Sequence, residues 1–273
     1  MSGLAESKQL EKKAFFSSDE LVGAYKDKLG EVEVRLRDGI YKDILFMSSK
    51  NSGVQSRINL LDPNVPSLAY IRTMCAASAL HSDPRDVLFL GMGGGSLPKY
   101  WIDHFPESQK TVVDLRPLMF QVARDHFMFE PDSRTHLVGD DANSFLIKAA
   151  SMGKKYDIIY VDIYIEGPAD IQNNQYFWDA IYKCLNPGGL VCSNLWTSGE
   201  NERKYFNIKK FHKKLFNTVF KIDNPESYQV ALYGTMQPKE SVVGVSSGIR
   251  AIEQMERTGI NFNEILLKYL RLV

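Results

Sequence analysis

The feature that most constrains this chain is a series of short, nearly continuous apolar runs that alternate with helix-forming segments from Pro66 onward. Strands of a parallel sheet buried on both faces have this composition. Alternation of strands with helices predicts right-handed crossovers and a doubly wound α/β fold. The predicted strands are Asp86–Leu90, Thr111–Asp114, Thr135–Val138, Tyr156–Asp162 and Gly189–Leu195, and the predicted helices cover 66–80, 97–104, 117–127, 142–151 and 172–185.

The C-terminal part of the chain continues this sheet in a different way. We expect a helix over 201–216, then two strands near 229–235 and 241–246 that close the sheet as an antiparallel edge. A last helix begins at about 261, and its apolar residues form one stripe, which predicts packing on its own domain. The stripe comprises Phe262, Ile265, Leu266, Tyr269, Leu270 and Val273.

The N-terminal part of the chain has the pattern of a small antiparallel sheet. Asp38–Gly39 stands between two strand-like runs, which is a strong hairpin signal. We therefore expect a first domain over 1–64, a helix plus a small β-sheet, and a Rossmann-like nucleoside-binding catalytic domain over 65–273. The predicted elements of the first domain are a helix at Glu20–Leu29 and strands at Glu31–Arg37, Ile40–Met47 and Val54–Asn59.

Composition narrows the class of partner. The chain has 33 Lys plus Arg and 33 Asp plus Glu, so its net charge is zero. A neutral chain does not attract nucleic acid or anionic membranes through its global field, so we expect a small-molecule or protein partner. A basic run on the predicted helix 201–216 has helical spacing and indicates a solvated face. This run comprises Lys209, Lys210, Lys213 and Lys214.

Cysteine, histidine and apolar patterns predict where the protein resides. The three cysteines form no CxxC pair, which favours a reduced compartment, and the five histidines show no metal-ligand spacing. No segment resembles a signal peptide or approaches the roughly 18 apolar residues of a membrane span. We expect a soluble, cytoplasmic protein without a bound metal.

The strongest functional signal is VLFLGMGGGSLPKY, at residues 87–100. A buried strand is followed by four glycines in five positions and then by a helix. The glycines permit positive φ and close backbone approach, and the helix N-terminus offers free N–H groups. Doubly wound folds hold nucleotide-like ligands in this way, although a tight turn alone would also require glycine. The glycines are Gly91, Gly93, Gly94 and Gly95.

Acidic residues follow the next three strands. Asp114 ends the second strand, where an acid can accept both hydroxyls of a ribose, and it can equally cap the next helix. Asp140 and Asp141 open a helix after the third strand, as helix caps or as acceptors for the amino group of an adenine. Asp162 ends the fourth strand, beside the centre of the sheet where ligands bind, and it is the best candidate for chemistry. Asn186–Gly189 is a turn into the fifth strand.

In their order and spacing these segments resemble the spermidine synthase superfamily, a branch of the S-adenosylmethionine methyltransferase fold, over about residues 30–200. The resemblance implies that the glycine loop and the acids bind an adenosyl sulfonium donor, and that Asp162 removes a proton from an attacking amine. The implied donor-site residues are Gln55, Gly91, Gly93, Gly94, Gly95, Asp114, Asp140 and Asp141. Tyr70 and Glu166 are the implied acceptor-site residues. Members of this family are often dimers, which implies a homodimer.

Three positions depart from the polyamine-forming members of that family. Gly94 stands where those members carry an aspartate, and Ile71 and Arg72 follow Tyr70 where they carry a glutamate. The segment after Asp162 is one residue shorter, so only Glu166 could replace a second aspartate. Such acids hold a diammonium substrate, because an unpaired buried cation is costly. The chain thus keeps the donor framework and lacks part of the polyamine clamp.

The resemblance implies aminopropyl transfer from decarboxylated S-adenosylmethionine to an amine, with Asp162 as general base. This would place the chain in polyamine biosynthesis, with a small-molecule amine as its partner. A methyltransferase that uses S-adenosylmethionine itself is the alternative. A non-catalytic nucleoside-binding module and an NAD-dependent oxidoreductase are two further hypotheses.

Overall fold

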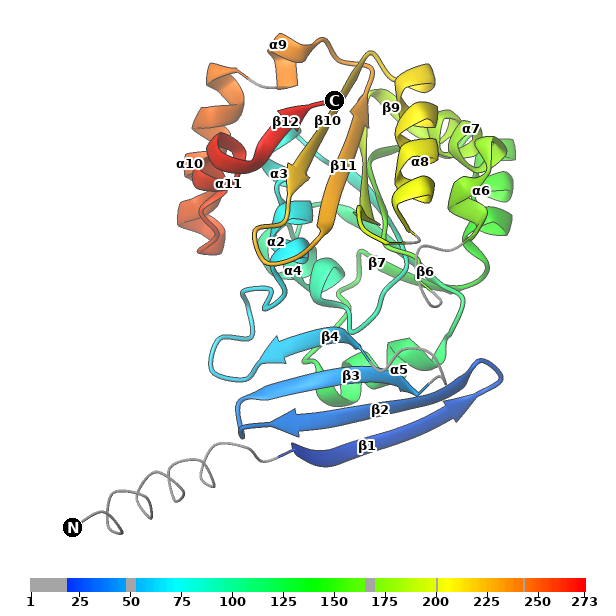
Figure 1. The fold of residues 1–273 in the computed structure, drawn as a ribbon, viewed down its shortest axis with the longest axis vertical. Helices are drawn as coiled ribbons and strands as arrows, with labels where there is room; N and C mark the ends of the chain where they lie inside the picture. The colour runs from blue at the N-terminus through cyan, green and yellow to red at the C-terminus, as the bar shows by residue number, and fades with distance from the viewer. Residues whose placement is uncertain (1–18, 48–52, 165–169, 200, 243) are drawn as a thin grey trace, which may run out of the picture.

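A computed structural model describes residues 19–47, 53–164, 170–199, 201–242 and 244–273. Two sheets organise these residues (Figure 1). The first is antiparallel, with the order β1-β2-β3-β4, and the second has the order β12-β10-β11-β9-β8-β5-β6-β7. No helix in this part of the chain is long and apolar enough to cross a membrane.

The N-terminal sheet contains a strand where the sequence predicted a helix. Its strands are β1 (Asp19–Asp27), β2 (Gly30–Arg37), β3 (Tyr41–Met47) and β4 (Val54–Asn59). The predicted helix at Glu20–Leu29 is wrong, because this segment pairs with β2 along its length. Tyr25 also reaches helix α5 (Leu118–His126), where its hydroxyl lies 2.8 Å from Nε2 of His126. Tertiary pairing here overrides the local pattern.

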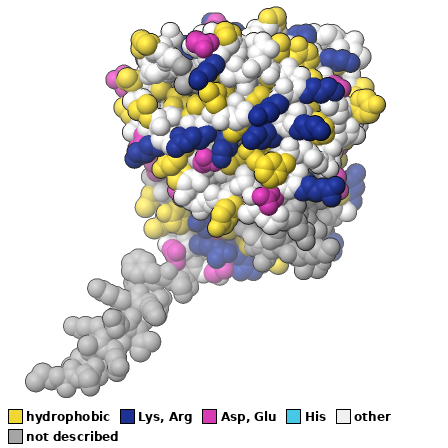
Figure 2. All heavy atoms as spheres, turned by 45° about the horizontal axis from the view of Figure 1, so that its top comes forward, with side chains coloured by type: hydrophobic (Ala, Val, Ile, Leu, Met, Phe, Trp, Pro, Cys, Tyr) yellow, Lys and Arg dark blue, Asp and Glu magenta, His cyan; other side chains and the backbone are white. Residues whose placement is uncertain are grey.

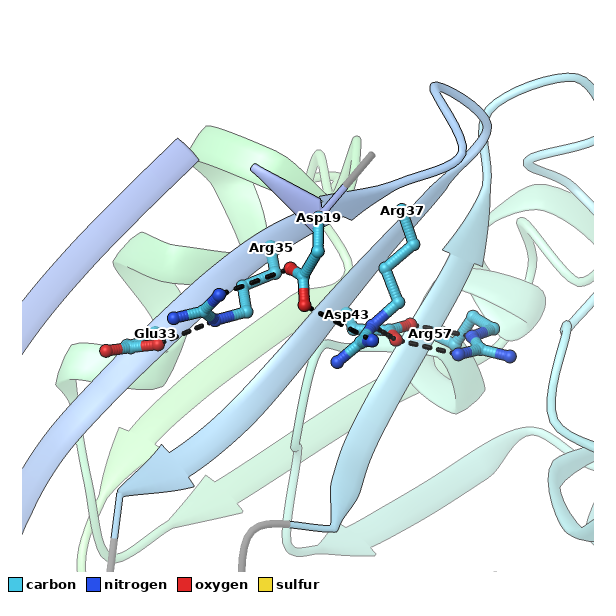
Figure 3. A network of polar contacts seen from close by, with 6 residues as sticks. All are labelled: Asp19, Glu33, Arg35, Arg37, Asp43 and Arg57. Atoms are coloured by element: carbon cyan, nitrogen blue, oxygen red, sulfur yellow. Dashed lines mark hydrogen bonds and ion pairs between the residues drawn. The ribbon is translucent and has the colours of Figure 1, made fainter. Parts of the chain in front are cut away.

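The two faces of the N-terminal sheet differ in chemistry. Alternate residues such as Val32 and Ile44 are buried against α5. The opposite face carries an ion-pair network (Figure 3). At its centre the buried Asp43 accepts hydrogen bonds of 2.6 and 2.7 Å from Arg57 and lies 2.8 Å from Arg37. Because the network joins residues of all four strands, it stabilises their register. Its members are Asp19, Glu33, Arg35, Arg37, Asp43 and Arg57.

The central sheet has a parallel core, as predicted. The strands β5, β6, β7, β8 and β9 pair in parallel, and alternate residues of each strand enter two hydrophobic clusters on opposite faces. These strands span Asp86–Leu90, Gln109–Asp114, Thr135–Gly139, Tyr156–Val161 and Leu185–Trp196. The doubly wound α/β fold is therefore confirmed.

Helices cover both faces of this sheet (Figure 1). One face is covered by α6, α7 and α8, and the other by α2, α3, α4, α10 and α11. The first group spans Ala142–Ser151, Gln175–Lys183 and Asn201–Leu215, with a short 3-10 turn, η1, at Asp170–Asn173. The second group spans Ala69–Cys75, Ala77–Leu80, Ser96–His104, Val245–Thr258 and Phe262–Tyr269.

The antiparallel edge is built from other segments than predicted. Strand β11 (Gln229–Thr235) lies where expected, but its outer partner is β10 (Thr218–Asp223), followed by β12 (Leu270–Leu272). The predicted strand at 241–246 is wrong, because this region holds α9 (Lys239–Val242) and the start of α10. Gly244 N–H donates to the Ser247 hydroxyl at 2.9 Å, which fixes the helix start. Helix α11 packs on its own domain as predicted, with Phe262 fully buried. The predicted stripe does not stay on one helix, because Leu270 belongs to β12 and Val273 follows it.

Two surface features bear on the expected partners. The lysines Lys210, Lys213 and Lys214 of α8 are exposed, in agreement with a solvated face. Figure 2 shows Lys and Arg side chains spread among apolar and uncharged ones over one face of the molecule.

The three cysteines are buried and unpaired. The domain boundary at residue 64 stays a prediction.

Candidate active site

A cavity of about 690 Å³ lies at the carboxyl ends of the parallel strands, where doubly wound sheets bind ligands. Residues of β3 and β4, among them Phe46 and Gln55, also line it. We call the part over β5, β6 and β7 the donor half, after the donor that the sequence predicts there, and its lining includes Glu31, Gln55, Gly91, Gly93, Asp114, Arg116, Asp140 and Asp141. We call the part over β8, β9 and β11 the acceptor half for the same reason, and its lining includes Leu68, Tyr70, Asp162, Tyr164, Asp170, Asn194, Trp196 and Gln229.

Gly91 marks the contact between the two halves. Its φ is +93°, and a Cβ atom there would lie 2.1 Å from the carbonyl oxygen of Asp162. The backbone of β5 and β8 approaches so closely because Asp162 N–H donates to Leu90 O at 2.8 Å. Only glycine tolerates both the positive φ and the close approach of the Asp162 backbone, so the loop and Asp162 are held in one rigid arrangement.

The four glycines of the loop divide into two pairs. Gly91 and Gly93 line the cavity, whereas Gly94 and Gly95 are not among its lining residues. Gly94 N–H donates to the hydroxyl of Ser56 on β4 at 2.7 Å, and a Cβ atom on Gly94 would lie 2.9 Å from Phe127. Gly94 therefore serves the packing of β4 against the loop.

Asp114 holds the glycine loop to the loop that follows β6. Its carboxylate accepts a 2.8 Å hydrogen bond from Met92 N–H and another of 2.8 Å from Arg116 N–H. Burial raises the pKa of Asp114, and these two bonds oppose that effect. Each oxygen keeps one lone pair, so the carboxylate can also accept hydroxyl groups of a ligand.

Asp140 and Asp141 both line the cavity, and both already have partners. Asp141 caps α6 by accepting from Ser144 N–H at 2.9 Å, so the capping hypothesis is confirmed for it. Asp140 accepts from Lys148 at 2.8 Å, and this ion pair lowers the pKa of Asp140. Asp140 therefore stays ionised at neutral pH.

Asp162 is the carboxylate of the acceptor half. Asn194 donates to one oxygen at 2.9 Å, and the hydroxyl of Tyr70 lies 3.4 Å from the other. Burial raises the pKa of Asp162 to about 6, although both hydrogen bonds favour the ionised form. A carboxylate with this pKa is ionised at pH 7 and is a better proton acceptor than an exposed aspartate.

Residues that sequence reasoning missed support Asp162. The amide of Gln229 donates to Asn194 Oδ1 at 3.4 Å, and Tyr164 donates to the Asn194 carbonyl at 2.8 Å. Asn194 is a polar residue near the end of the mainly apolar strand β9, and this interruption was the feature of the sequence that could have indicated it. Gln229 could not have been found, because β11 joins β9 only through the antiparallel edge.

The cavity is lined by many more acids than bases. Its described lining contains six carboxylates and one cationic side chain, Arg116. Arg116 is already bound by Asp27, through hydrogen bonds of 2.8 and 2.9 Å. The six acids are Glu31, Asp114, Asp140, Asp141, Asp162 and Asp170. Such a cavity favours cationic ligands.

The remaining predicted residues are placed as follows. Gln55 lies on β4 with its amide donating to Gly53 O at 3.1 Å, and Tyr70 lies on α2. Glu166 lies outside the described residues. Within the part of the chain that the structure describes, no three His, Cys, Asp or Glu side chains are grouped as a metal ion would require.

Residues 69–235 match the spermine/spermidine synthase domain, which is more than half of the chain. The chain belongs to this family. It is 26% identical over 198 residues to the polyamine aminopropyltransferase of Vibrio vulnificus, an alignment that covers 70% of this chain and 64% of that protein. The match therefore spans less than two thirds of the relative's length.

Solved structures show the same fold. A probable spermidine synthase from Corynebacterium glutamicum has a TM-score of 0.71 at 20% identity, with 86% of this chain and 88% of that chain covered. Human methyltransferase-like protein 13 in complex with SAH has a TM-score of 0.61 at 24% identity, with 70% and 91% covered. The family and the methyltransferase-like fold agree with the expectation from the sequence.

Two departures from the polyamine-forming family members, Arg72 and Gly94, acquire a physical explanation. Arg72 does not line the cavity, because its guanidinium donates to the carbonyls of Pro66 and Ser67 and to Glu226. It therefore does not introduce a cation into the acceptor half. Gly94 likewise leaves no room for a side chain.

Proposed function

We propose that this family member transfers an aminopropyl group from decarboxylated S-adenosylmethionine to an amine. The observation that carries the proposal is Asp162, a partly buried carboxylate with a pKa of about 6 in a cavity whose described lining has six acids and one cationic side chain. A base of this kind suits an acceptor that must lose a proton before it attacks. Family membership and the polyamine aminopropyltransferase of Vibrio vulnificus support the same reaction.

In this proposal the donor half holds the adenosyl part of the donor. The second lone pairs of Asp114 accept the ribose hydroxyls, Asp140 and Asp141 lie where the adenine amino group needs an acceptor, and Gly91 and Gly93 admit the chain bearing the sulfonium. Gln55 covers the donor from β4. The charge of the cavity supports the decarboxylated donor, because the one cation of the described lining, Arg116, is engaged by Asp27 and no other is available for a donor carboxylate.

The reaction then follows from charge and position. The acceptor enters as an ammonium ion and loses one proton to Asp162. The nitrogen lone pair forms a bond to the carbon next to the sulfonium, and the carbon–sulfur bond breaks with its electron pair remaining on sulfur. The products are a neutral thioether and a secondary ammonium ion, and the proton on Asp162 returns to solvent. Tyr70 and Asn194 keep the carboxylate directed at the acceptor.

Methyl transfer from S-adenosylmethionine is the second candidate, and the fold shared with human methyltransferase-like protein 13 favours it. The two reactions leave different nucleosides. The purified chain is incubated with primary amines and either donor, and the products are identified by mass spectrometry. We expect methylthioadenosine from the decarboxylated donor. S-adenosylhomocysteine would instead establish methyl transfer, and binding of both donors without product would indicate a nucleoside-binding module.

The cytoplasmic location, the homodimer and the role of Glu166 at the acceptor remain part of the proposal. The buried, unpaired cysteines support a reducing compartment. Light scattering of the purified chain during gel filtration tests the homodimer directly.

A further inference from the structure

We infer that Ser227, an exposed residue of the turn between β10 and β11, is a positioning residue for Asp162. This role rests on the proposed function, in which Asp162 is the base. The Ser227 hydroxyl fixes the orientation of two side-chain amides in succession. The second of these amides then keeps an N–H donor on the Asp162 carboxylate, so a residue of the surface turn controls the base inside the cavity.

The hydroxyl of Ser227 has one direction in which to donate its proton. Its oxygen accepts from Asn224 Nδ2 at 2.7 Å and from Gln229 N–H at 3.2 Å. Asn224 is itself oriented, because its Oδ1 accepts from Glu226 N–H at 3.0 Å. A hydroxyl has two lone pairs and one proton, so the Ser227 proton is left to be donated. It is donated to Gln229 Oε1 at 3.1 Å.

This bond determines which way the Gln229 amide points. With Oε1 held by Ser227, Nε2 faces Asn194 and donates to its Oδ1 at 3.4 Å. Asn194 therefore presents Nδ2 to Asp162, 2.9 Å from one carboxylate oxygen. An Asn194 amide turned by half a revolution would place two NH2 groups against each other and an oxygen against the carboxylate, and both contacts are repulsive. Orientation is thus passed from the turn to Asp162 through two amides.

The titratable groups around Asp162 belong to other elements than this turn. A substitution of Ser227 leaves them unchanged, so a different pKa of Asp162 in a Ser227 variant reports the donor on Asn194. The groups that interact with Asp162 are Tyr70 on α2, Asp114 on β6, Tyr164 after β8 and Cys192 on β9.

Carbon-13 NMR titration of the Asp162 carboxyl group in Ser227→Ala tests this role, with the resonance assigned by its loss in Asp162→Asn. Without the hydroxyl, the Gln229 amide loses the donor that orients it, and the ionised carboxylate loses part of its own donor. We expect the pKa of Asp162 to rise by about half a unit, and the low-pH limb of kcat/KM to move with it. Ser227→Thr keeps the hydroxyl and should retain the parent value. An unchanged pKa in Ser227→Ala would overturn the inference.

Thr197→Val is the matched control for a loosened turn. The Thr197 hydroxyl donates to Tyr228 O at 2.8 Å, so it holds the same turn by its backbone. The pKa of Asp162 should keep the parent value in this variant. A rise equal to that in Ser227→Ala would assign the effect to loss of the turn and overturn the inference.

A double variant tests the route through Asn194. In an Asn194→Leu background, Ser227→Ala should raise the pKa of Asp162 no further, because its effect passes through the missing amide. An additive rise would overturn the inference. The titration needs no substrate, so it separates the inference from the proposed function. A parent chain that transfers no group to any amine would overturn the proposed function alone, and a pKa of Asp162 that is insensitive to Ser227 would overturn the inference alone.

Discussion

The donor half and the acceptor half of the cavity are built in different ways. In the donor half, Asp114 and Asp141 accept hydrogen bonds from backbone N–H groups of nearby loops and of a helix N-terminus. In the acceptor half, Asp162 is held by Asn194 and Tyr70, which are 32 and 92 positions away in the chain. Short motifs thus form the donor half, whereas the acceptor half requires several distant elements to pack together.

The two halves also differ in what a substitution should change. In the donor half the carboxylates of Asp114 and Asp141 also hold the nearby backbone, so we expect their substitution to lower donor affinity. In the described acceptor half we propose Asp162 as the base, so its loss should remove the reaction and leave donor affinity unchanged. Five predictions test this difference, beginning with the largest expected effect and ending with the smallest.

The largest effect is expected for Asp162→Asn. Removal of a general base lowers turnover by about 10³-fold, and donor affinity should stay within about twofold because Asp162 belongs to the acceptor half. Steady-state kinetics and calorimetric titration of the donor measure the two effects. A variant that remains fully active would show that Asp162 is not the base.

The same variant should be more stable than the parent at high pH. The folded-state pKa of Asp162 is raised from 3.8 to about 6, so the ionised carboxylate opposes folding as pH rises through this range. The cost reaches at most about 3 kcal/mol above pH 6 and vanishes below pH 4. Urea unfolding of Asp162→Asn and the parent at pH 4 and pH 8 measures it. An equal gain in the free energy of unfolding at pH 4 and pH 8 would contradict the ionised carboxylate as the cause.

Gly91→Ala should disrupt the junction between the two halves. The added Cβ atom would lie 2.1 Å from the Asp162 carbonyl oxygen, which the backbone cannot accommodate, so we expect a loss of about 4 kcal/mol in stability. Gly153→Ala is the matched control, because Gly153 also has positive φ, +66°, with nothing within 4 Å of its Cβ position. The control should lose only about 1 kcal/mol. Equal losses in chemical denaturation would show that φ, not close approach, requires glycine at 91.

Asp114→Asn should weaken donor binding by about 10- to 100-fold, because an uncharged amide replaces a carboxylate that accepts several hydrogen bonds. Asp157→Asn is the control. Asp157 also accepts two backbone N–H groups, those of Arg85 and Asp86 at 2.8 and 3.0 Å, and it does not line the cavity. Calorimetry should find donor affinity reduced in the first variant alone. A similar reduction in both would mean that stability, not contact, is responsible.

The smallest effect concerns pH. Turnover of the parent should fall as pH decreases through about 6, because Asp162 becomes protonated. Asn194→Leu removes a 2.9 Å hydrogen bond to the ionised form, so this limb of kcat/KM should move to higher pH by about one unit. Tyr70→Phe removes a longer contact of 3.4 Å and should move the limb less. A larger shift in Tyr70→Phe would contradict the assigned order.

Two segments fold differently from what their local sequence predicts, and each difference has a physical cause. The segment 20–29 has a composition that either helix or strand accepts, and its pairing with β2 decides for a strand. The segment 241–246 contains three valines, which favour a strand, yet Ser247 caps a helix there, and β10 takes the edge position beside β11. Edge strands depend on long-range pairing, so local periodicity constrains them least.

The sequence by itself determined the parallel core, the glycine loop and the acids at the strand ends. Those features are encoded locally, because an apolar strand, a glycine turn and a helix start are adjacent in the chain. Only the tertiary structure placed Asn194 and Gln229 beside Asp162, directed Arg72 away from the cavity, and turned Gly94 towards Ser56 and Phe127. These contacts join residues that become neighbours only when the two sheets and the antiparallel edge have formed. The donor half could therefore be anticipated, and the charge of the acceptor half could not.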